Sequence, residues 1–377
     1  MDKAKVFFTD FRTVAFGDGL PAKLKKLAKA AGMGGIDFEG KFAAIKLHFG
    51  ELGNVSFLRP NYAKAIADLV KELGGKPFLT DCNTMYPGSR KNALEHLECA
   101  WENGFSPLSA GCPILIGDGL KGTDDVAVPV QGGVYVKEAR IGRAVMDADV
   151  FISLTHFKGH ESTGFGGAIK NIGMGCGSRA GKTEQHSGGK ARIKAALCRG
   201  CRKCLKECAH GALSFDPSTR KTHVVRENCV GCGRCLGACN FDAIVFEDNA
   251  ANALLNYRMA EYAKAVLDGR PHFHLSLVVD VSPNCDCHNE NDAPILPNLG
   301  MFASFDPLAL DQACADACLG ASPLPGSQLW DNLAKPGFVD RRDHFLNSAP
   351  DSEWRSCLEH AERIGLGSRS YELVRMR

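Results

Sequence analysis

The sequence predicts an α/β protein whose mostly parallel, doubly covered sheet is interrupted by a small cysteine-rich α+β insert. The sheet is predicted because short, continuously apolar runs alternate with helical patterns on both sides of the insert. Strands that are apolar throughout are typical of parallel sheets buried on both faces. The insert is predicted because eight cysteines fall between residues 198 and 239. We therefore expect residues 1–189 and 249–377 to form one α/β domain around an insert of residues 190–248.

Apolar runs bounded by polar or glycine-rich turns mark the expected strands. In chain order these runs are residues 42–47, 77–80, 113–116, 149–155 and 275–281. Helical patterns lie between and after them, and proline near a start or glycine past an end is typical of helix boundaries. The expected helices are residues 60–75, 89–104, 137–149, 252–269 and 307–320.

Composition narrows the class of protein. The chain is 45% hydrophobic and 23% charged, which is ordinary for a globular protein, and its net charge of +2 gives no general attraction to nucleic acid or membrane. The first residues include acidic side chains and lack the apolar core of a secretory signal, and no apolar run approaches the ~20 residues of a membrane span. Seventeen cysteines in such a chain indicate metal sites in a reducing compartment. We expect a cytoplasmic protein without nucleic-acid or membrane partners.

Two cysteine motifs lie in the insert. The runs CRGCRKCLKEC (198–208) and CVGCGRCLGAC (229–239) both fit the spacing C-x2-C-x2-C-x3-C. In this arrangement the first three thiolates of a run bind one cluster and the fourth binds the other. Zinc is the alternative, but structural zinc sites use two separated pairs of ligands. We predict two [4Fe–4S] clusters, one held by Cys198, Cys201, Cys204 and Cys239, the other by Cys229, Cys232, Cys235 and Cys208.

The insert resembles the bacterial two-cluster ferredoxin over about residues 190–248. The proline usual after the fourth cysteine of each run is replaced here by Ala209 and Asn240. The segment has eleven Lys/Arg and six Asp/Glu residues, a net charge of +5. A basic surface attracts acidic partners, so an acidic redox donor such as a ferredoxin or flavodoxin is one interpretation. The alternative is that these basic residues are simply a solvated face.

Polar residues follow several of the expected strands. His48 follows the first strand, and the fourth ends in THFKGH, which supplies His156, Lys158 and His160. Ligand sites of parallel sheets lie outside the carboxyl ends of the strands. We therefore expect a site at this edge of the sheet.

The last expected strand runs into VSPNCDCHNEND (281–292), which suggests a third metal centre. Pro283 and Asn284 end the strand, so the cysteines that follow lie in a turn where both can face one metal. We predict a metal centre, preferably an iron–sulfur cluster rather than zinc. The alternative is that the cysteines are buried thiols and the histidine a turn residue. The predicted ligands are Cys176, Cys285, Cys287 and His288, with His186 as a substitute.

Two further stretches carry a family resemblance. THFKGHESTGFGGAIKNIGMG (155–175), with His160, Thr163, Lys170 and Asn171, resembles the core signature of the domain-of-unknown-function family numbered 362. SFDPLALDQA (304–313) resembles its C-terminal signature, in which Asp306 can also cap the following helix. The insert and NCDCH resemble the branch called uncharacterised iron–sulfur center proteins. This resemblance implies iron–sulfur binding but no established substrate.

These patterns favour an oxidoreductase. Electrons would enter through the two clusters and reach a third centre and a small, anionic substrate held by Lys158, Lys170 and Arg179. Histidine suits proton transfer because its ordinary pKa is near 6.5. The alternatives are a non-enzymatic electron-transfer subunit or iron–sulfur carrier, and a redox-regulated hydrolytic or ligase-like site. The candidate catalytic residues are His48, His156, Lys158, His160, Lys170 and Asn171.

Overall fold

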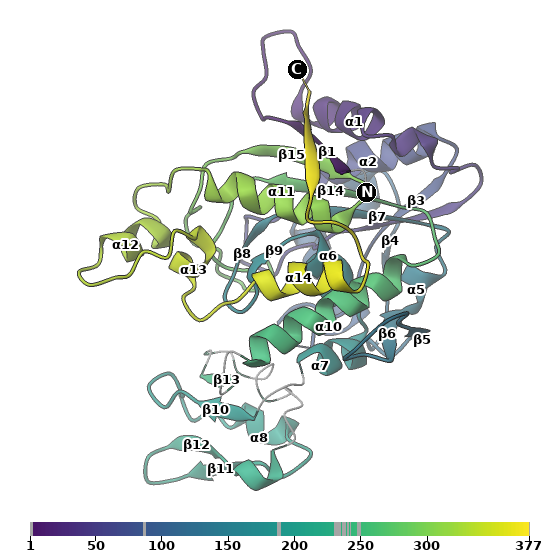
Figure 1. The fold of residues 1–377 in the computed structure, drawn as a ribbon. Helices are drawn as coiled ribbons and strands as arrows, with labels where there is room; N and C mark the ends of the chain where they lie inside the picture. Colours follow the sequence, from purple (N-terminus) through teal and green to yellow (C-terminus); the bar gives the residue numbers. More distant parts are fainter. Residues whose placement is uncertain are drawn as a thin grey trace.

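The structure is a computed structural model that describes residues 3–85, 88–186, 190–229, 235, 239, 241, 243–246 and 250–376. Its main body is an α/β fold around an eight-stranded sheet, and the small cysteine-rich segment lies at one end of it (Figure 1). The predicted α/β class is therefore confirmed. Within these described ranges, no helix is long and apolar enough to cross a membrane.

The sheet is mostly parallel and takes strands from both sides of the cysteine-rich segment. β15 pairs antiparallel with its two neighbours, β1 and β14, and the other neighbouring strands pair parallel. The five predicted strands correspond to β2, β3, β4, β7 and β14. Across the sheet the strands are β16 (Tyr371–Arg375), β1 (Ala4–Thr9), β15 (Gly300–Ser304), β14 (His272–Val278), β7 (Val150–His156), β2 (Phe42–Lys46), β3 (Lys76–Asp81) and β4 (Ile114–Ile116).

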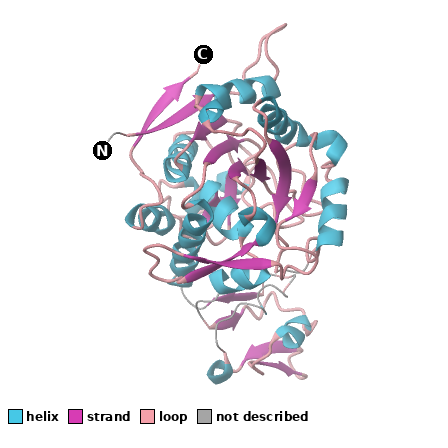
Figure 2. Cartoon of the chain, turned by 90° about the vertical axis from the view of Figure 1, so that its right-hand side faces the viewer, coloured by secondary structure: helices cyan, strands magenta, loops and turns pink. Residues whose placement is uncertain are grey.

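Helices cover both faces of this sheet (Figure 2), and each face has its own apolar core. Side chains alternate between the faces along each strand, so Ala43 and Ile45 join one core while Ala44 joins the other. Over the first face lie α1 (Leu20–Ala30), α2 (Pro60–Glu72), α3 (Ala93–Glu102), α4 (Pro107–Ala110) and the 3-10 turn Met33–Gly35. Over the second lie α6 (Ala168–Cys176), α10 (Ala250–Leu267), α11 (Pro307–Leu319) and α14 (Arg355–Arg363).

Helix α6 packs unusually closely against α10. A Cβ atom added at Gly173 would lie 2.0 Å from the carbonyl oxygen of Met259. Only glycine therefore permits this approach of the two backbones. The close packing fixes α6 under the sheet, and α6 carries Lys170 and Asn171.

The helix predicted over residues 137–149 is wrong for most of its length. Residues in its first part form a strand that pairs with a neighbouring strand as a hairpin, and only a single helical turn follows. The reason is burial with a period of two: Ala139 and Ile141 are buried, whereas Glu138 and Arg140 are exposed. The elements are β5 (Asp125–Pro129), β6 (Glu138–Gly142) and α5 (Arg143–Met146).

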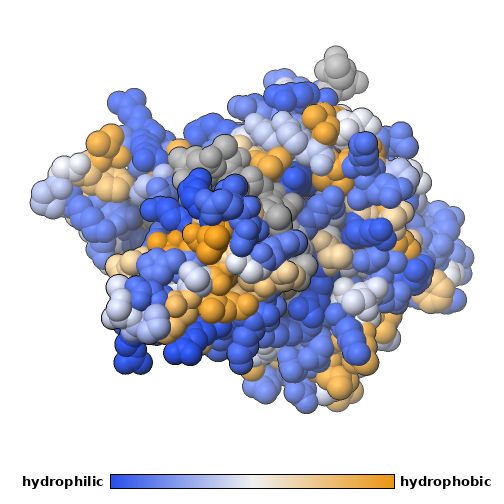
Figure 3. Space-filling view, turned by 90° about the horizontal axis from the view of Figure 1, so that it is seen from below, coloured by the Kyte–Doolittle hydropathy of each residue, from blue (hydrophilic) through white to orange (hydrophobic). Residues whose placement is uncertain are grey.

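The cysteine-rich segment contains two small antiparallel sheets and a short helix. β10 pairs with β13, and β11 pairs with β12. Seen from below (Figure 3), hydrophilic side chains cover much of this end of the molecule. Cys232 lies outside the described residues. The elements are β10 (Ala191–Ile193), α8 (Lys203–Glu207), β11 (Leu213–Asp216), β12 (Lys221–Val224), the 3-10 turn Arg226–Asn228 and β13 (Ile244–Phe246).

The remaining described elements flank the carboxyl edge of the sheet and the second face. Two short strands directly after β7 form a hairpin. These elements are β8 (Lys158–His160), β9 (Gly164–Gly166), α7 (Arg179–His186), α12 (Gln328–Ala334) and α13 (His344–Ser348).

Candidate functional site

The carboxyl ends of β2, β3, β7 and β14 meet at one edge of the sheet, as the sequence predicts. These strands are neighbours and run parallel, so the residues that follow them approach one another. The loop after β14 lies here, and Gly159 packs against the backbone of Ser282 and Pro283. The predicted residues of β7, β8 and α6 therefore meet the loop that contains the two cysteines.

Cys285 is the centre of this site and is only 1% exposed. The Nζ atom of Lys170 lies 3.3 Å from its sulfur. The thiol of Cys287 and the ring of His160 also hydrogen-bond to this sulfur, and the charge of Lys158 acts on it. The hydrogen bond from Cys287 is the largest of these effects, and together they hold the pKa of Cys285 well below its ordinary value. The site is built to carry a thiolate.

The pKa values of Cys287 and Lys170, the two groups beside this thiolate, are raised. The pKa of Cys287 is raised well above its ordinary value because its thiol donates to Cys285 and because it is buried. Burial alone would lower the pKa of Lys170, but the negative charges of the two cysteines and of Glu161 outweigh burial and raise it. One negative charge is thus shared by two sulfurs beside a protonated lysine.

His160 is oriented to donate a hydrogen bond to the sulfur. Its Nδ1 atom accepts hydrogen bonds from the backbone amides of Ser162 and Thr163, at 3.0 and 3.1 Å. A neutral imidazole with Nδ1 as acceptor carries its proton on Nε2. The Nε2–H group is therefore the donor to Cys285.

Asp286, between the two cysteines, is held by charges on the opposite side of the loop. It is 0% exposed, and its carboxylate lies 2.9 Å from Nδ1 of His156 and 3.3 Å from Nζ of Lys158. Nε2 of His156 lies 2.7 Å from the carbonyl oxygen of Val279. Both nitrogens of His156 thus face acceptors, and this ring anchors the loop.

His288 is engaged by Glu161. Its Nε2 atom lies 3.1 Å from Glu161, and its side chain is 27% exposed. Burial alone would lower the pKa of His288, but the carboxylate of Glu161 raises it to about 9.

His48 lies against Arg90 on the other side of the loop. Nη1 of Arg90 lies 2.9 Å from its Nε2 atom, and the amide of Gly50 donates to its Nδ1 atom at 2.9 Å. Arg90 is itself paired with Glu51 at 3.0 Å. Burial first, and then the guanidinium charge, lower the pKa of His48 well below its ordinary value. His48 is thus a neutral ring beside the site.

A buried lysine that the sequence reasoning missed lies at the end of β2. Lys46 is 1% exposed, and its Nζ atom lies 3.0 Å from Asp81 and 2.8 Å from Oδ1 of Asn171. Asn171 also donates to Thr155 at 3.0 Å. Asn171 therefore positions Lys46 and ties α6 to the sheet. The available signal was a lysine within an otherwise apolar strand.

Asp311, from the C-terminal signature, caps the helix that carries Lys170. Its two carboxylate oxygens accept hydrogen bonds from the amides of Ala168 and Ile169, at 2.6 and 2.9 Å. Burial raises the pKa of Asp311 to about 7. Asp306 caps its own helix α11, as the sequence predicts. The two signatures, distant in the chain, therefore meet at the start of α6.

The other residues predicted around a third centre have different surroundings. Cys176 ends α6, where burial raises the pKa of its thiol to about 11. Nδ1 of His186 donates to the carbonyl oxygen of Lys182 at 2.7 Å, and the backbone of Arg179 pairs with Gly122. Among the described residues, no three His, Cys, Asp or Glu side chains are placed to hold one metal ion. The third metal centre remains a prediction.

The cysteine-rich segment contains a cavity that gathers cysteines of both motifs. Thr222 lines it too, and its hydroxyl lies 3.8 Å from the sulfur of Cys204. Nearby, the amide of Ala212 donates to the sulfur of Cys208 at 3.3 Å. The four cysteines that line the cavity are Cys198, Cys201, Cys204 and Cys239, the set predicted for one cluster.

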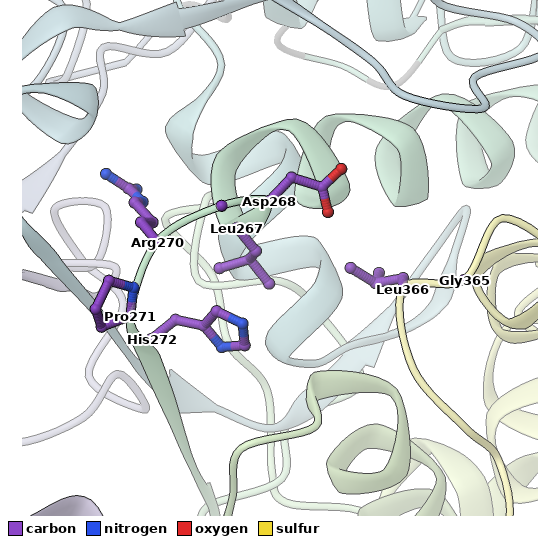
Figure 4. A pocket seen from close by; sticks show the side chains of 8 residues that line it. Leu267, Asp268, Arg270, Pro271, His272, Gly365 and Leu366 are labelled. Atoms are coloured by element: carbon purple, nitrogen blue, oxygen red, sulfur yellow. The ribbon is translucent and has the colours of Figure 1, made fainter. Parts of the chain in front are cut away.

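A further cavity lies at the opposite edge of the sheet, where β14 begins (Figure 4). Leu267, Asp268, His272 and Leu366 are among its lining residues. Figure 4 shows the guanidinium of Arg270 pointing away from it, and Nη1 of this residue donates to a backbone carbonyl at 2.7 Å. Asp268 is paired with a lysine at 3.0 Å. We assign this cavity no chemistry.

The fold and the site together define an α/β protein with a buried cysteine–lysine site and a separate cysteine-rich segment. Residues 43–316 match the family described as Domain of unknown function (DUF362), and the chain belongs to this family. It is 32% identical over 130 residues to the thylakoid-associated protein sll1697 of Synechocystis sp. (strain ATCC 27184 / PCC 6803 / Kazusa). This match spans 33% of this chain and 34% of that protein.

Two solved structures are similar to parts of the chain. One is the lactate racemase apoprotein from Thermoanaerobacterium thermosaccharolyticum, with 13% identity, a TM-score of 0.38, and coverage of 68% of this chain and 49% of that one. The other is a protein from Thermotoga maritima, with 14% identity, a TM-score of 0.41, and coverage of 79% and 57%. Likenesses at this level carry no argument about activity.

Proposed function

We propose that this chain is an iron–sulfur oxidoreductase. Two [4Fe–4S] clusters, held by the eight cysteines of residues 190–248, would pass electrons to the buried site around Cys285. The observation that carries the proposal is the cavity lined by Cys198, Cys201, Cys204 and Cys239. Three of these come from one motif and the fourth from the other, which is the exchange of ligands expected in two-cluster proteins.

The donor set fits a cluster better than a single ion. Sulfur ligands lie only ~2.3 Å from a zinc ion, so four of them must crowd around one point. The four cysteines line one cavity together with eight other residues, among them Thr222 and Phe241. A cluster of four irons is wider, and it holds its ligands farther apart. Bound there, it would supply one-electron transfer.

The chain's own residues suit the receiving site for reductive chemistry. Lys170 and Lys158 supply positive charge around a thiolate, and His160 directs an N–H group at it. The two ammonium groups can hold an anionic substrate and deliver protons as electrons arrive, while the N–H group of His160 stabilises the thiolate. Asn171 and His156 position the site, through Lys46 and Asp286 respectively.

The burial of Cys285 favours a second candidate function. Its 1% exposure leaves little of the sulfur within reach of a substrate. An electron-transfer subunit or iron–sulfur carrier, in which a partner protein completes the reaction, fits this burial. Turnover of a small substrate by the isolated chain would decide for the oxidoreductase.

The entry of electrons is testable through the charge of the cysteine-rich segment. We expect an acidic ferredoxin to reduce the protein at a rate that falls as salt increases. Replacing the exposed Lys203 and Lys206 of α8 by glutamate should slow reduction at low salt by about tenfold or more. The control is Lys121→Glu, an exposed lysine of the main body. Salt-independent reduction, unchanged in the double variant, would contradict this entry route.

A further inference from the structure

We infer that Cys285 and Cys287 form a dithiol–disulfide centre that exchanges two electrons with a small disulfide substrate. The source of the electrons rests on the proposed function, whereas the thiol pair itself rests on the geometry of the loop. This assignment replaces a metal at the pair with covalent sulfur chemistry.

The loop brings the two cysteines together in a tight turn. The amide of His288 donates to the carbonyl oxygen of Cys285 at 3.0 Å, which closes this turn. Asp286, between the cysteines, is engaged by His156 and Lys158. The thiol of Cys287 lies close enough to the sulfur of Cys285 to lower its pKa. Two cysteines one residue apart in such a turn are suited to forming a disulfide.

The surroundings of the pair oppose a bound cation. The ammonium of Lys170 lies 3.3 Å from the sulfur of Cys285. Lys158 adds a second positive charge nearby, and His288 is engaged by Glu161. Positive charge beside sulfur stabilises a thiolate and repels a metal ion, so this environment suits a nucleophilic thiol.

Two clusters that each carry one electron can supply the two electrons that reduction of the Cys285–Cys287 disulfide needs. Reduction of the protein disulfide breaks the bond between the two sulfurs and consumes two electrons and two protons. Each cluster carries one electron, so two clusters supply the pair. The ammonium of Lys170 lies where it can deliver the protons, which solvent replaces, and a low-potential one-electron donor restores the clusters.

The exchange with substrate then needs no further co-reactant. One cysteine attacks a sulfur of the substrate disulfide, and a mixed disulfide forms as the first substrate thiolate leaves and takes a proton. The second cysteine attacks the mixed disulfide, so the protein disulfide re-forms and the second substrate thiol departs. Cys287 is partly exposed and Cys285 is buried, so Cys287 attacks the substrate as its thiol proton passes to the thiolate of Cys285, and the mixed disulfide is expected on Cys287.

The test uses the anaerobically purified full chain with oxidised glutathione as the probe. After exposure to the probe, free thiols are blocked and the Cys285–Cys287 peptide is identified by mass spectrometry. We expect a disulfide between these two residues, and a glutathione adduct trapped on Cys287 in the Cys285→Ser variant. Cys314 and Cys318, buried four residues apart in α11, serve as internal controls and should remain thiols.

The possible outcomes test two claims separately: that the two cysteines form a dithiol centre, and that the clusters deliver electrons to it. No disulfide between Cys285 and Cys287, or the loss of bound iron or zinc in Cys285→Ser, would overturn the dithiol centre. A disulfide that forms with glutathione and is reduced when methyl viologen reduces the clusters supports both claims. A disulfide that forms but persists beside reduced clusters would leave the dithiol centre standing and overturn the electron route.

Discussion

Replacing Lys46 by methionine is expected to destabilise the protein by about 3–5 kcal/mol. Lys46 and Asp81 are 1% and 3% exposed in their side chains, and their charged atoms lie 3.0 Å apart. Methionine keeps most of the volume of lysine but removes the ammonium. Asp81 would then be a buried carboxylate without its partner, and Asn171 would lose its contact at 2.8 Å. Both losses act at the junction of the sheet and α6.

Denaturant unfolding followed by circular dichroism measures this effect. The control is Lys29→Met, which removes an exposed ion pair with Glu72 and should cost less than about 1 kcal/mol. Adding Asp81→Asn to Lys46→Met removes the unpaired charge and should recover much of the loss. If Lys46→Met cost no more than Lys29→Met, the buried pair would not have the structural role described here.

Glu261→Ala is expected to cost about 2–4 kcal/mol. Glu261 is 0% exposed and accepts hydrogen bonds from the amides of Val134, Tyr135 and Val136 at 2.6–3.2 Å. It also lies 2.8 Å from Nε2 of His360. Its removal from α10 leaves these donors without an acceptor and disconnects α14 from the loop before β6. Glu359→Ala, which alters an exposed pair, is the matched control.

The buried carboxylate of Glu261 should also make the stability of the protein depend on pH. Burial alone would raise the pKa of Glu261, but hydrogen bonds from His360 and the loop amides outweigh burial and lower it from 4.5. The carboxylate therefore contributes stability above about pH 4.5 that is lost as the pH falls through the folded-state pKa. We expect the stability difference between wild type and Glu261→Gln to shrink on acidification. A difference that is constant between about pH 6 and pH 3 would contradict this reasoning.

Much of the fold could be predicted from the sequence because its strands are apolar throughout. The runs that became β2, β7 and β14 read as buried strands without any knowledge of their partners. Residues 137–149 were wrongly predicted as a helix because their composition permits one. In the structure, residues 138–142 form a strand because they pair with β5, a contact that the local sequence does not reveal. β1, β15 and β16 were not predicted, and their pairing joins residues about 300 positions apart.

The candidate site was partly predictable for the same reason. Lys158 and His160 follow a strand whose end meets those of its neighbours, Lys170 belongs to the family signature, and the structure gathers all three around Cys285. Lys46, Arg90 and Glu161 were not predicted as site residues, because their roles depend on which charge packs opposite them. His288 was predicted as a metal ligand from its position after Cys287, and this stays a prediction; in the structure its ring lies 3.1 Å from Glu161. Sequence spacing cannot reveal such a partner.

The most direct test of the central claim is the iron, zinc and acid-labile sulfide content per chain after anaerobic purification. The wild type and Cys285→Ser should both contain about eight irons and about eight sulfides, with no zinc. Zinc without sulfide in the wild type would contradict the two clusters. About twelve irons, falling to about eight in Cys285→Ser, would instead make Cys285 a ligand of a third cluster and contradict the dithiol centre.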